Sequence, residues 1–185
     1  MTLFAYGSLV SPESLAATVG RAVPAGRGPL PAVLGDHARE WMVGSDRESH
    51  PERVLVAEDG SVFTGTLAVL GIRAAAGAVC TGAVYELDDA AVASLGVRER
   101  NYTLVEVSVR VAGRQGPRRV VTFVPRPGAV ERLVRARAAG TAVVRAGYAD
   151  LVADAFRRLG PGQGEAYART TVPHGLPVRG VRVAG

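Results

Sequence analysis

Residues 105–111, with the sequence VEVSVRV, alternate strictly between valine and a polar residue. Successive side chains of a β-strand point to opposite faces, so the valines would share one face and the polar residues the other. This pattern predicts a strand with one buried face. The fold of this chain is therefore expected to contain a sheet.

Other segments predict the same mixture of strands and helices. A first strand ends at Tyr6, and further strands are expected over residues 53–58, 61–72, 78–87 and 118–125. Helices are expected over residues 11–20, 128–140 and 148–160, the first with Ser11 as N-cap, Pro12 at the first helical position and Gly20 at its end. A Gly/Pro-rich connection covers residues 23–31. Strands without a regular βαβ alternation indicate an α+β fold, and 185 residues are expected to form a single domain, residues 1–185.

Composition narrows the classes of partner and compartment. The chain carries a formal net charge of +5 but contains no lysine, and its arginines are scattered rather than interleaved with aromatic residues, so we expect no nucleic-acid partner. No apolar run is long enough to span a bilayer, and the N-terminus lacks the pattern of a secretory signal. Cys80 is the only cysteine and lies in an apolar stretch, which suggests a buried thiol. We expect a cytoplasmic protein without a membrane partner; its oligomeric state stays open.

The first strand breaks off at Tyr6-Gly7-Ser8-Leu9. A glycine here allows either a positive φ or the close approach of another group. Gly7 and Ser8 could simply open a turn, or their backbone N–H groups could form a small concavity that binds an anion. The tetrapeptide alone does not decide between these readings.

Residues 88–102, DDAAVASLGVRERNY, contain the strongest candidate for acid–base chemistry. Asp88 or Asp89 would cap a helix. If this helix continues past Gly96, Glu99 falls on its apolar face, where burial would raise the pKa of the carboxyl group towards the range useful for proton transfer. If Gly96 ends the helix, Glu99 is a solvated loop residue.

Other chemistry has less support. His37, His50 and His174 are far apart in the sequence and lack partners at metal-ligand spacing, so no metal site is expected. Ser8 follows a strand and precedes a helix, as in a nucleophile elbow, but the surrounding G-x-S-x-G pattern is absent.

Taken together, FAYGSL at residues 4–9, DHAREW at residues 36–41 and the segment 82–109 resemble the gamma-glutamylcyclotransferase-like superfamily, including its ChaC branch. The resemblance extends through residues 148–160 and the pair Thr170-Thr171. It implies a small mixed β-barrel flanked by α-helices, with a pocket at one end. It also implies that the loop Tyr6, Gly7, Ser8 and Leu9 binds the carboxylate of a small-molecule gamma-glutamyl substrate, that Glu99 is catalytic and that Tyr102 is a binding residue.

The implied reaction is ring closure of a gamma-glutamyl amide to 5-oxoproline with release of an amine, and it requires neither a metal nor an organic cofactor. Two alternatives remain: a non-catalytic ligand-binding or interaction module on the same fold, and hydrolysis through Ser8. The leaving amine is not predicted, because glutathione, gamma-glutamyl amino acids, gamma-glutamylamines and biosynthetic intermediates share the same glutamyl half. The roles of the Arg/Ala-rich segment 131–146 and of the C-terminal tail are also open.

Overall fold

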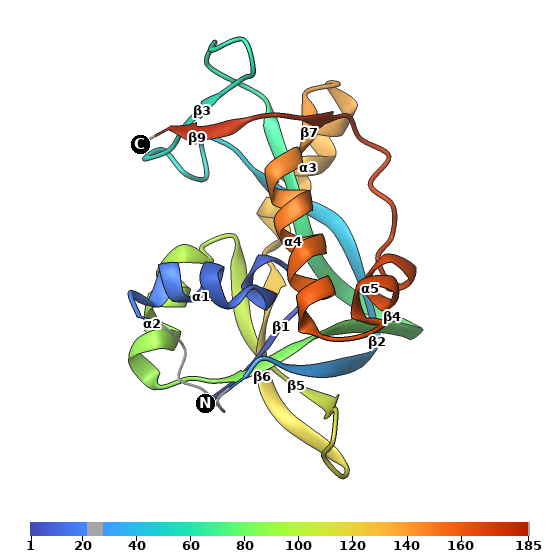
Figure 1. Cartoon of the computed structure of the whole chain (residues 1–185). Helices are drawn as coiled ribbons and strands as arrows, with labels where there is room; N and C mark the ends of the chain where they lie inside the picture. The colour runs from blue at the N-terminus through green and yellow to red at the C-terminus, as the bar shows by residue number, and fades with distance from the viewer. Residues whose placement is uncertain (22–27, 185) are drawn as a thin grey trace.

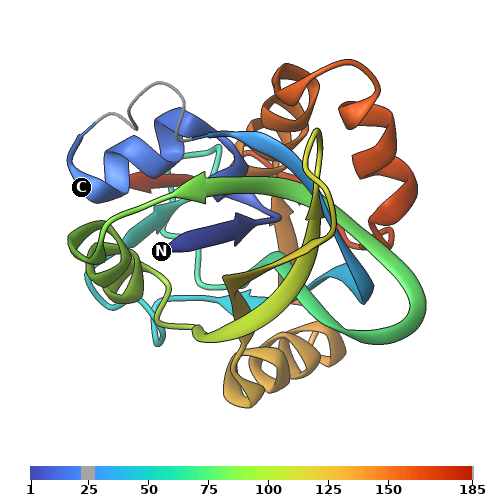
Figure 2. The ribbon, with the colours of Figure 1, turned by 90° about the horizontal axis from the view of Figure 1, so that it is seen from below.

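The computed structural model describes residues 1–21 and 28–184 and contains a closed β-barrel surrounded by helices (Figure 1). The barrel strands follow the order β1, β6, β5, β2 and β4, and β4 also pairs with β1, which closes the barrel. Their bounds are β1 (Thr2–Ala5), β2 (Leu30–Ser45), β4 (Thr66–Glu86), β5 (Tyr102–Val111) and β6 (Pro117–Pro125). Seen from below, the strands curve around a common interior (Figure 2). The predicted α+β barrel is confirmed.

The alternating valine segment forms β5, as predicted. Val109 and Val111 are buried, whereas Glu106 and Ser108 are exposed. β5 forms an antiparallel pair with β6, from Tyr102 opposite Pro125 to Arg110 opposite Pro117. The alternation therefore predicts correctly which face of β5 points into the barrel.

The strands predicted over residues 61–72 and 78–87 are a single strand, β4. Its first half pairs with the second half of β2, and its second half pairs with the first half of β2 and with β1. Register shifts interrupt the β2–β4 pairing between Gly35 and His37 and between Trp41 and Val43, and such irregularities allow long strands to bend around a barrel. Gly82 permits the close approach of β1, because a Cβ at this position would collide with the carbonyl oxygen of Ala5. The prediction of two strands was wrong because the apolar pattern fades over residues 73–79, which lie mostly at the surface.

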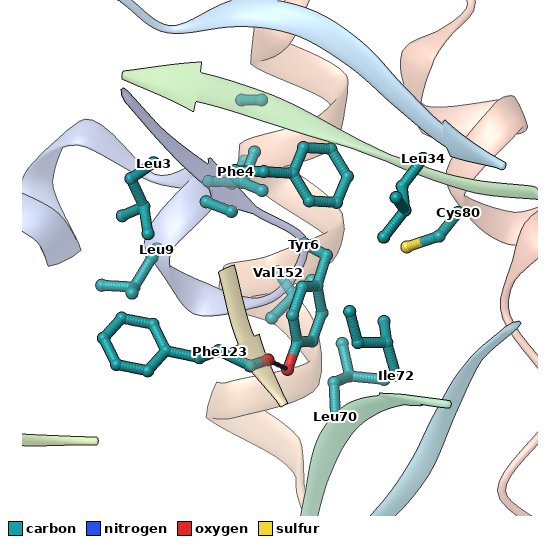
Figure 3. Packing of buried hydrophobic residues seen from close by; sticks show 14 of the residues in the cluster. Leu3, Phe4, Tyr6, Leu9, Leu34, Leu70, Ile72, Cys80, Phe123 and Val152 are labelled. Atoms are coloured by element: carbon teal, nitrogen blue, oxygen red, sulfur yellow. Dashed lines mark hydrogen bonds between the residues drawn. The ribbon is translucent and has the colours of Figure 1, made fainter. Parts of the chain in front are cut away.

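The barrel is filled by apolar side chains from all sides (Figure 3). Phe4 and Tyr6 lie on the side of β1 that faces Leu34, Leu70 and Ile72 of the long strands, whereas Leu3 lies on the other side near Leu9, and α4 contributes Val152. The Tyr6 hydroxyl donates a hydrogen bond of 2.6 Å to the carbonyl oxygen of Phe123 on β6. Cys80 is buried as predicted, and Trp41 and Tyr85 are buried as well. This core holds β1, and therefore the loop that follows it, in a defined position.

The helices have the bounds α1 (Pro12–Val19), α2 (Asp89–Arg98), α3 (Pro127–Ala138), α4 (Ala146–Leu159) and α5 (Gln163–Thr170). The side chains of Ser11 and Asp88 accept hydrogen bonds from the backbone N–H groups of Ser14 and Ala91, so they cap α1 and α2. Both views show α1 and α2 on one side of the barrel and α4 and α5 on another (Figures 1 and 2). Within residues 1–21 and 28–184, no helix combines the length and apolar character that crossing a membrane requires.

The strand expected over residues 53–58 is present as β3 (Val54–Val56), whereas several other strands were not predicted. β7 (Ala142–Arg145) lies parallel to β4, and β8 (Val178–Arg179) lies parallel to β7. β3 (Val54–Val56) pairs with β9 (Arg182–Ala184) in a small separate sheet at one end of the barrel (Figure 1). The segment 131–146 thus completes α3 and forms β7, and the C-terminal tail adds strands. Most of the predicted connection 23–31 lies outside the described residues, and its last two residues begin β2.

Among the described residues, Arg39 on β2 is the largest fully buried side chain. Its guanidinium carbon lies 4.8 and 4.5 Å from the ring centroids of Phe156 and Tyr167, which stack on each other with their centroids 4.6 Å apart. The oxygen atoms that accept its hydrogen bonds are carbonyls of Tyr6, Thr81 and Tyr167 and hydroxyls of Thr81, Thr170 and Thr171. Among the described residues no carboxylate pairs with Arg39. It joins the barrel to α5 and to the backbone of Tyr6.

Candidate active site

A cavity of about 300 Å³ lies between α2, the loop after β1, β3 and the start of α4. Its volume falls at the lower end of the range for small-molecule sites. A smaller recess of about 40 Å³ adjoins it and shares Ser8, Glu99, Tyr102 and Tyr148 with it. All the site residues predicted from the sequence line this recess: Tyr6, Gly7, Ser8, Leu9, Glu99 and Tyr102. The fold thus brings together segments that are distant in the sequence.

Glu99 is the C-cap of α2. The helix continues through Gly96 to Arg98, and the backbone N–H of Glu99 donates a hydrogen bond of 2.8 Å to the carbonyl oxygen of Leu95. The Glu99 side chain is only 15% exposed. Burial raises the pKa of its carboxyl group, and the charges of Arg98 and Arg53 oppose this effect. Of the two sequence interpretations, the buried carboxyl group is therefore correct, and the solvated loop residue is not.

Arg98 connects Glu99 to α1 and to the loop after β1. Its Nε lies 3.2 Å from Oε1 of Glu99. Its terminal nitrogens donate hydrogen bonds to the Ser8 hydroxyl at 3.1 Å, to the Ser14 carbonyl at 3.0 Å and to the Thr18 hydroxyl. The Ser8 hydroxyl is thus held by a cation, and among the described residues no histidine contacts it. A histidine-activated serine does not match this arrangement.

The loop Tyr6–Leu9 leads into a short 3₁₀ turn, Ser8–Val10. Gly7 has φ −127°, so the positive φ considered from the sequence is wrong, and the alternative of close approach is correct. A Cβ at Gly7 would lie 3.3 Å from the Tyr148 hydroxyl oxygen. Within the described part of the chain, the N–H groups of Ser8 and Leu9 have no hydrogen-bond partner, as expected for the first residues of a helical turn. These donors are available to a ligand.

Two further tyrosines meet at Leu70 of β4. The Tyr102 hydroxyl donates a hydrogen bond of 2.7 Å to the Leu70 carbonyl, and the Tyr148 hydroxyl accepts one of 3.4 Å from the Leu70 N–H. Burial raises the pKa of both phenols, so both are neutral at physiological pH. The sequence interpretation included the helix of Tyr148 but did not assign this residue to the site. The one feature of the sequence that could have indicated a role for Tyr148 in the site is its position at the start of the helix predicted over residues 148–160.

No group of three or more His, Cys, Asp or Glu side chains that could hold a metal ion occurs among residues 1–21 and 28–184. His50 lines the main cavity, where its Nδ1 lies 3.2 Å from the Ser45 hydroxyl and 3.1 Å from the Ser49 hydroxyl. Burial lowers the pKa of His50 to about 4, so the ring is neutral at physiological pH.

Comparison with family models finds no match, and comparison with curated protein sequences finds none either. Solved structures do match over nearly the whole chain. A structure described as gamma-glutamyl cyclotransferase is 14% identical and has a TM-score of 0.56, and the match covers 96% of this chain and 92% of that one. The chain has the gamma-glutamylcyclotransferase-like fold.

Two other structures share the gamma-glutamylcyclotransferase-like fold with this chain. An uncharacterised protein from Homo sapiens is 15% identical with a TM-score of 0.58, and the match covers 94% of this chain and 89% of that one. YkqA from Bacillus subtilis is 18% identical with a TM-score of 0.58, and the match covers 95% of this chain but only 56% of YkqA. At these identities the likeness establishes the gamma-glutamylcyclotransferase-like fold and leaves the reaction to be argued from the site.

Proposed function

We propose that this protein cyclises a gamma-glutamyl amide to 5-oxoproline and releases an amine, with Glu99 as general acid and base. The observation that carries the proposal is the position of Glu99: a buried carboxyl group with a raised pKa, in a recess that it shares with the loop Tyr6–Leu9 and Tyr102. The fold relationship to a gamma-glutamyl cyclotransferase supports the same reaction class.

The substrate's glutamyl half occupies the recess. Its α-carboxylate accepts hydrogen bonds from the free N–H groups of Ser8 and Leu9. The chain folds back so that its α-amine faces the γ-carbonyl carbon, beside Glu99. Intramolecular attack within this folded chain gains several kcal/mol from proximity.

Glu99 moves the protons. As carboxylate it takes a proton from the α-ammonium group, whose nitrogen then attacks the γ-carbonyl. A new C–N bond closes the five-membered ring, and the bond to the leaving nitrogen breaks as Glu99 returns the proton to it. The ammonium group loses two protons in total and the leaving amine gains two, so transfer through one carboxyl group in successive steps balances the reaction.

A test of product identity distinguishes this reaction from hydrolysis. The purified protein is incubated with a panel of gamma-glutamyl compounds in H₂¹⁸O, and the expected product is 5-oxoproline without solvent oxygen. A serine nucleophile at Ser8 would instead give an ester intermediate and ¹⁸O-labelled glutamate.

N-acetylated substrates provide the matched control, because acetylation removes the nucleophilic amine and leaves the amide bond available to a serine. Their binding is first established by calorimetry. Cleavage of a bound N-acetylated compound would overturn the cyclisation mechanism. A protein that binds gamma-glutamyl compounds but turns none over would support the non-catalytic binding module.

A further inference from the structure

The main cavity contains more positive charge than its own side chains neutralise. Its charged lining residues are Arg53, Arg98, Arg145, Asp46 and Glu99. His50 adds no charge at neutral pH, because burial keeps its pKa at about 4. The ion pairs of these five residues show which arginines carry the excess positive charge.

Three of the charged groups are already paired. Asp46 lies 3.3 Å from Nε of Arg132, which is outside the cavity lining, and Arg98 pairs with Glu99. By contrast, Arg145 is partly buried, and its side chain makes no hydrogen bond or ion pair with any described residue. An unpaired guanidinium that is partly removed from water is costly, so this residue calls for an anionic partner.

The guanidinium of Arg53 also lacks a close carboxylate of its own. Its nearest carboxylate is that of Glu52, at 3.9 Å, and Glu52 also pairs with Arg100 at 3.3 Å. Burial lowers the pKa of Arg53, but a guanidinium stays charged at any physiological pH. Two arginines therefore line the cavity without a satisfying partner of their own.

Both arginines lie outside the recess. Arg53 directly precedes β3, and Arg145 ends β7 just before α4; neither lines the recess that holds Glu99 and the Tyr6–Leu9 loop. A substrate whose glutamyl half fills the recess extends its leaving half into the main cavity, towards these side chains. The wall there also includes the apolar residues Leu55 and Val183 from the small β3–β9 sheet, beside polar residues such as Ser45 and His50.

We propose that Arg145 and Arg53 form a binding site for a carboxylate on the leaving half of the substrate, so that the substrates are gamma-glutamyl amino acids or peptides rather than gamma-glutamylamines. This inference rests on the proposed function and identifies its substrate class. A guanidinium binds a carboxylate through paired, charge-assisted hydrogen bonds. A simple amine as leaving group would leave both arginines unpaired. Leu55 and Val183 provide apolar contacts for the leaving amino acid's side chain.

The test uses two compounds that differ only in the carboxylate: γ-glutamyl-L-alanine and γ-glutamylethylamide. We expect kcat/KM for 5-oxoproline formation to be about 10- to 100-fold higher for the alanine compound, as for a hydrogen bond between charged groups. In Arg145→Gln this ratio should fall at least tenfold, mainly through KM for the alanine compound. Arg110→Gln, which removes an exposed arginine on β5, is the matched control and should keep the wild-type ratio.

Equal efficiency with both compounds in the wild-type protein, or an unchanged ratio in Arg145→Gln, would overturn this inference while leaving cyclisation intact. Calorimetric titration of Glu99→Gln with both compounds separates the two proposals. Tighter binding of the alanine compound without turnover by the wild-type protein would support the carboxylate site and refute the cyclisation. Equal affinity, or no binding of either compound, would refute the carboxylate site.

Discussion

Nε of Arg98 lies 3.2 Å from Oε1 of Glu99, the next residue in the chain. The same guanidinium donates a hydrogen bond of 3.1 Å to the Ser8 hydroxyl. One side chain therefore connects the proposed acid–base group to the loop proposed to hold the substrate carboxylate. It also opposes the effect of burial on the pKa of Glu99. The site thus depends on a positioning residue as well as on the groups that face the substrate.

Glu99→Gln should abolish most of the turnover. Glutamine keeps the shape of the side chain but cannot accept the ammonium proton, and a general acid–base group contributes about 10²- to 10⁴-fold in rate. Steady-state formation of 5-oxoproline measures the loss, and circular dichroism checks that the fold is intact. A variant with near-normal kcat would show that Glu99 is not the base.

Arg98→Met should move the acidic limb of the kcat/KM profile to higher pH. Burial raises the pKa of Glu99 and Arg98 lowers it, so removal of the guanidinium raises the pKa further. The carboxylate is the form that accepts the proton. A higher pKa of Glu99 therefore shifts the pH at which activity appears to a higher value. Arg100→Met removes an exposed arginine on the other side of Glu99 and should leave the limb in place. A limb that moves to lower pH in Arg98→Met would contradict the assignment of this limb to Glu99.

Gly7→Ala should weaken binding of a non-reactive gamma-glutamyl analogue about tenfold or more. The new Cβ would lie 3.3 Å from the Tyr148 hydroxyl oxygen and would displace either the loop or the tyrosine. Calorimetry measures the affinity. The double variant Gly7→Ala/Tyr148→Phe removes that oxygen, so the effects of the two substitutions should not be additive. Unchanged affinity in Gly7→Ala would indicate that the loop is only a turn.

Arg39→Met should destabilise the protein by about 3 kcal/mol or more, because it leaves several buried carbonyl and hydroxyl oxygens without donors. Urea denaturation measures the free energy of unfolding. Arg39→Lys should recover little of this loss, since a single ammonium group cannot reach acceptors spread over β4 and α5. Wild-type stability in Arg39→Met would disprove the structural role of this arginine.

The stability should fall on mild acidification because of His50. Its pKa is about 4 in the folded protein, well below the ordinary value of 6.5, so the unfolded chain binds the proton first as the pH falls. The stability that this residue contributes is complete above pH 6.5 and is lost as the pH falls through the folded pKa. Between pH 7 and pH 5 the loss should be about 2 kcal/mol. Denaturation curves of His50→Gln should show a correspondingly smaller pH dependence, and an equal dependence would contradict the lowered pKa.

The sequence by itself determined the local elements. The valine alternation of β5 and the Ser11 and Asp88 caps depend on the strand pleat and the helix turn, which act over a few residues. The resemblance, in turn, pointed to Tyr6–Leu9, Glu99 and Tyr102, and the structure places these residues around one recess. Whether Glu99 was buried stayed open, because Gly96 can end a helix or lie within one.

Tertiary structure alone decided which distant segments meet. β4 spans residues 66–86 because it pairs with both halves of β2 and with β1, and no local pattern specifies such long-range pairing. The same holds for β7, β8 and β9, which are short and become strands only through their partners. Arg53 enters the cavity from just before β3, and Arg145 and Tyr148 enter it from the junction of β7 and α4. Their roles arise from barrel closure, which sets distances between residues that the local sequence does not relate.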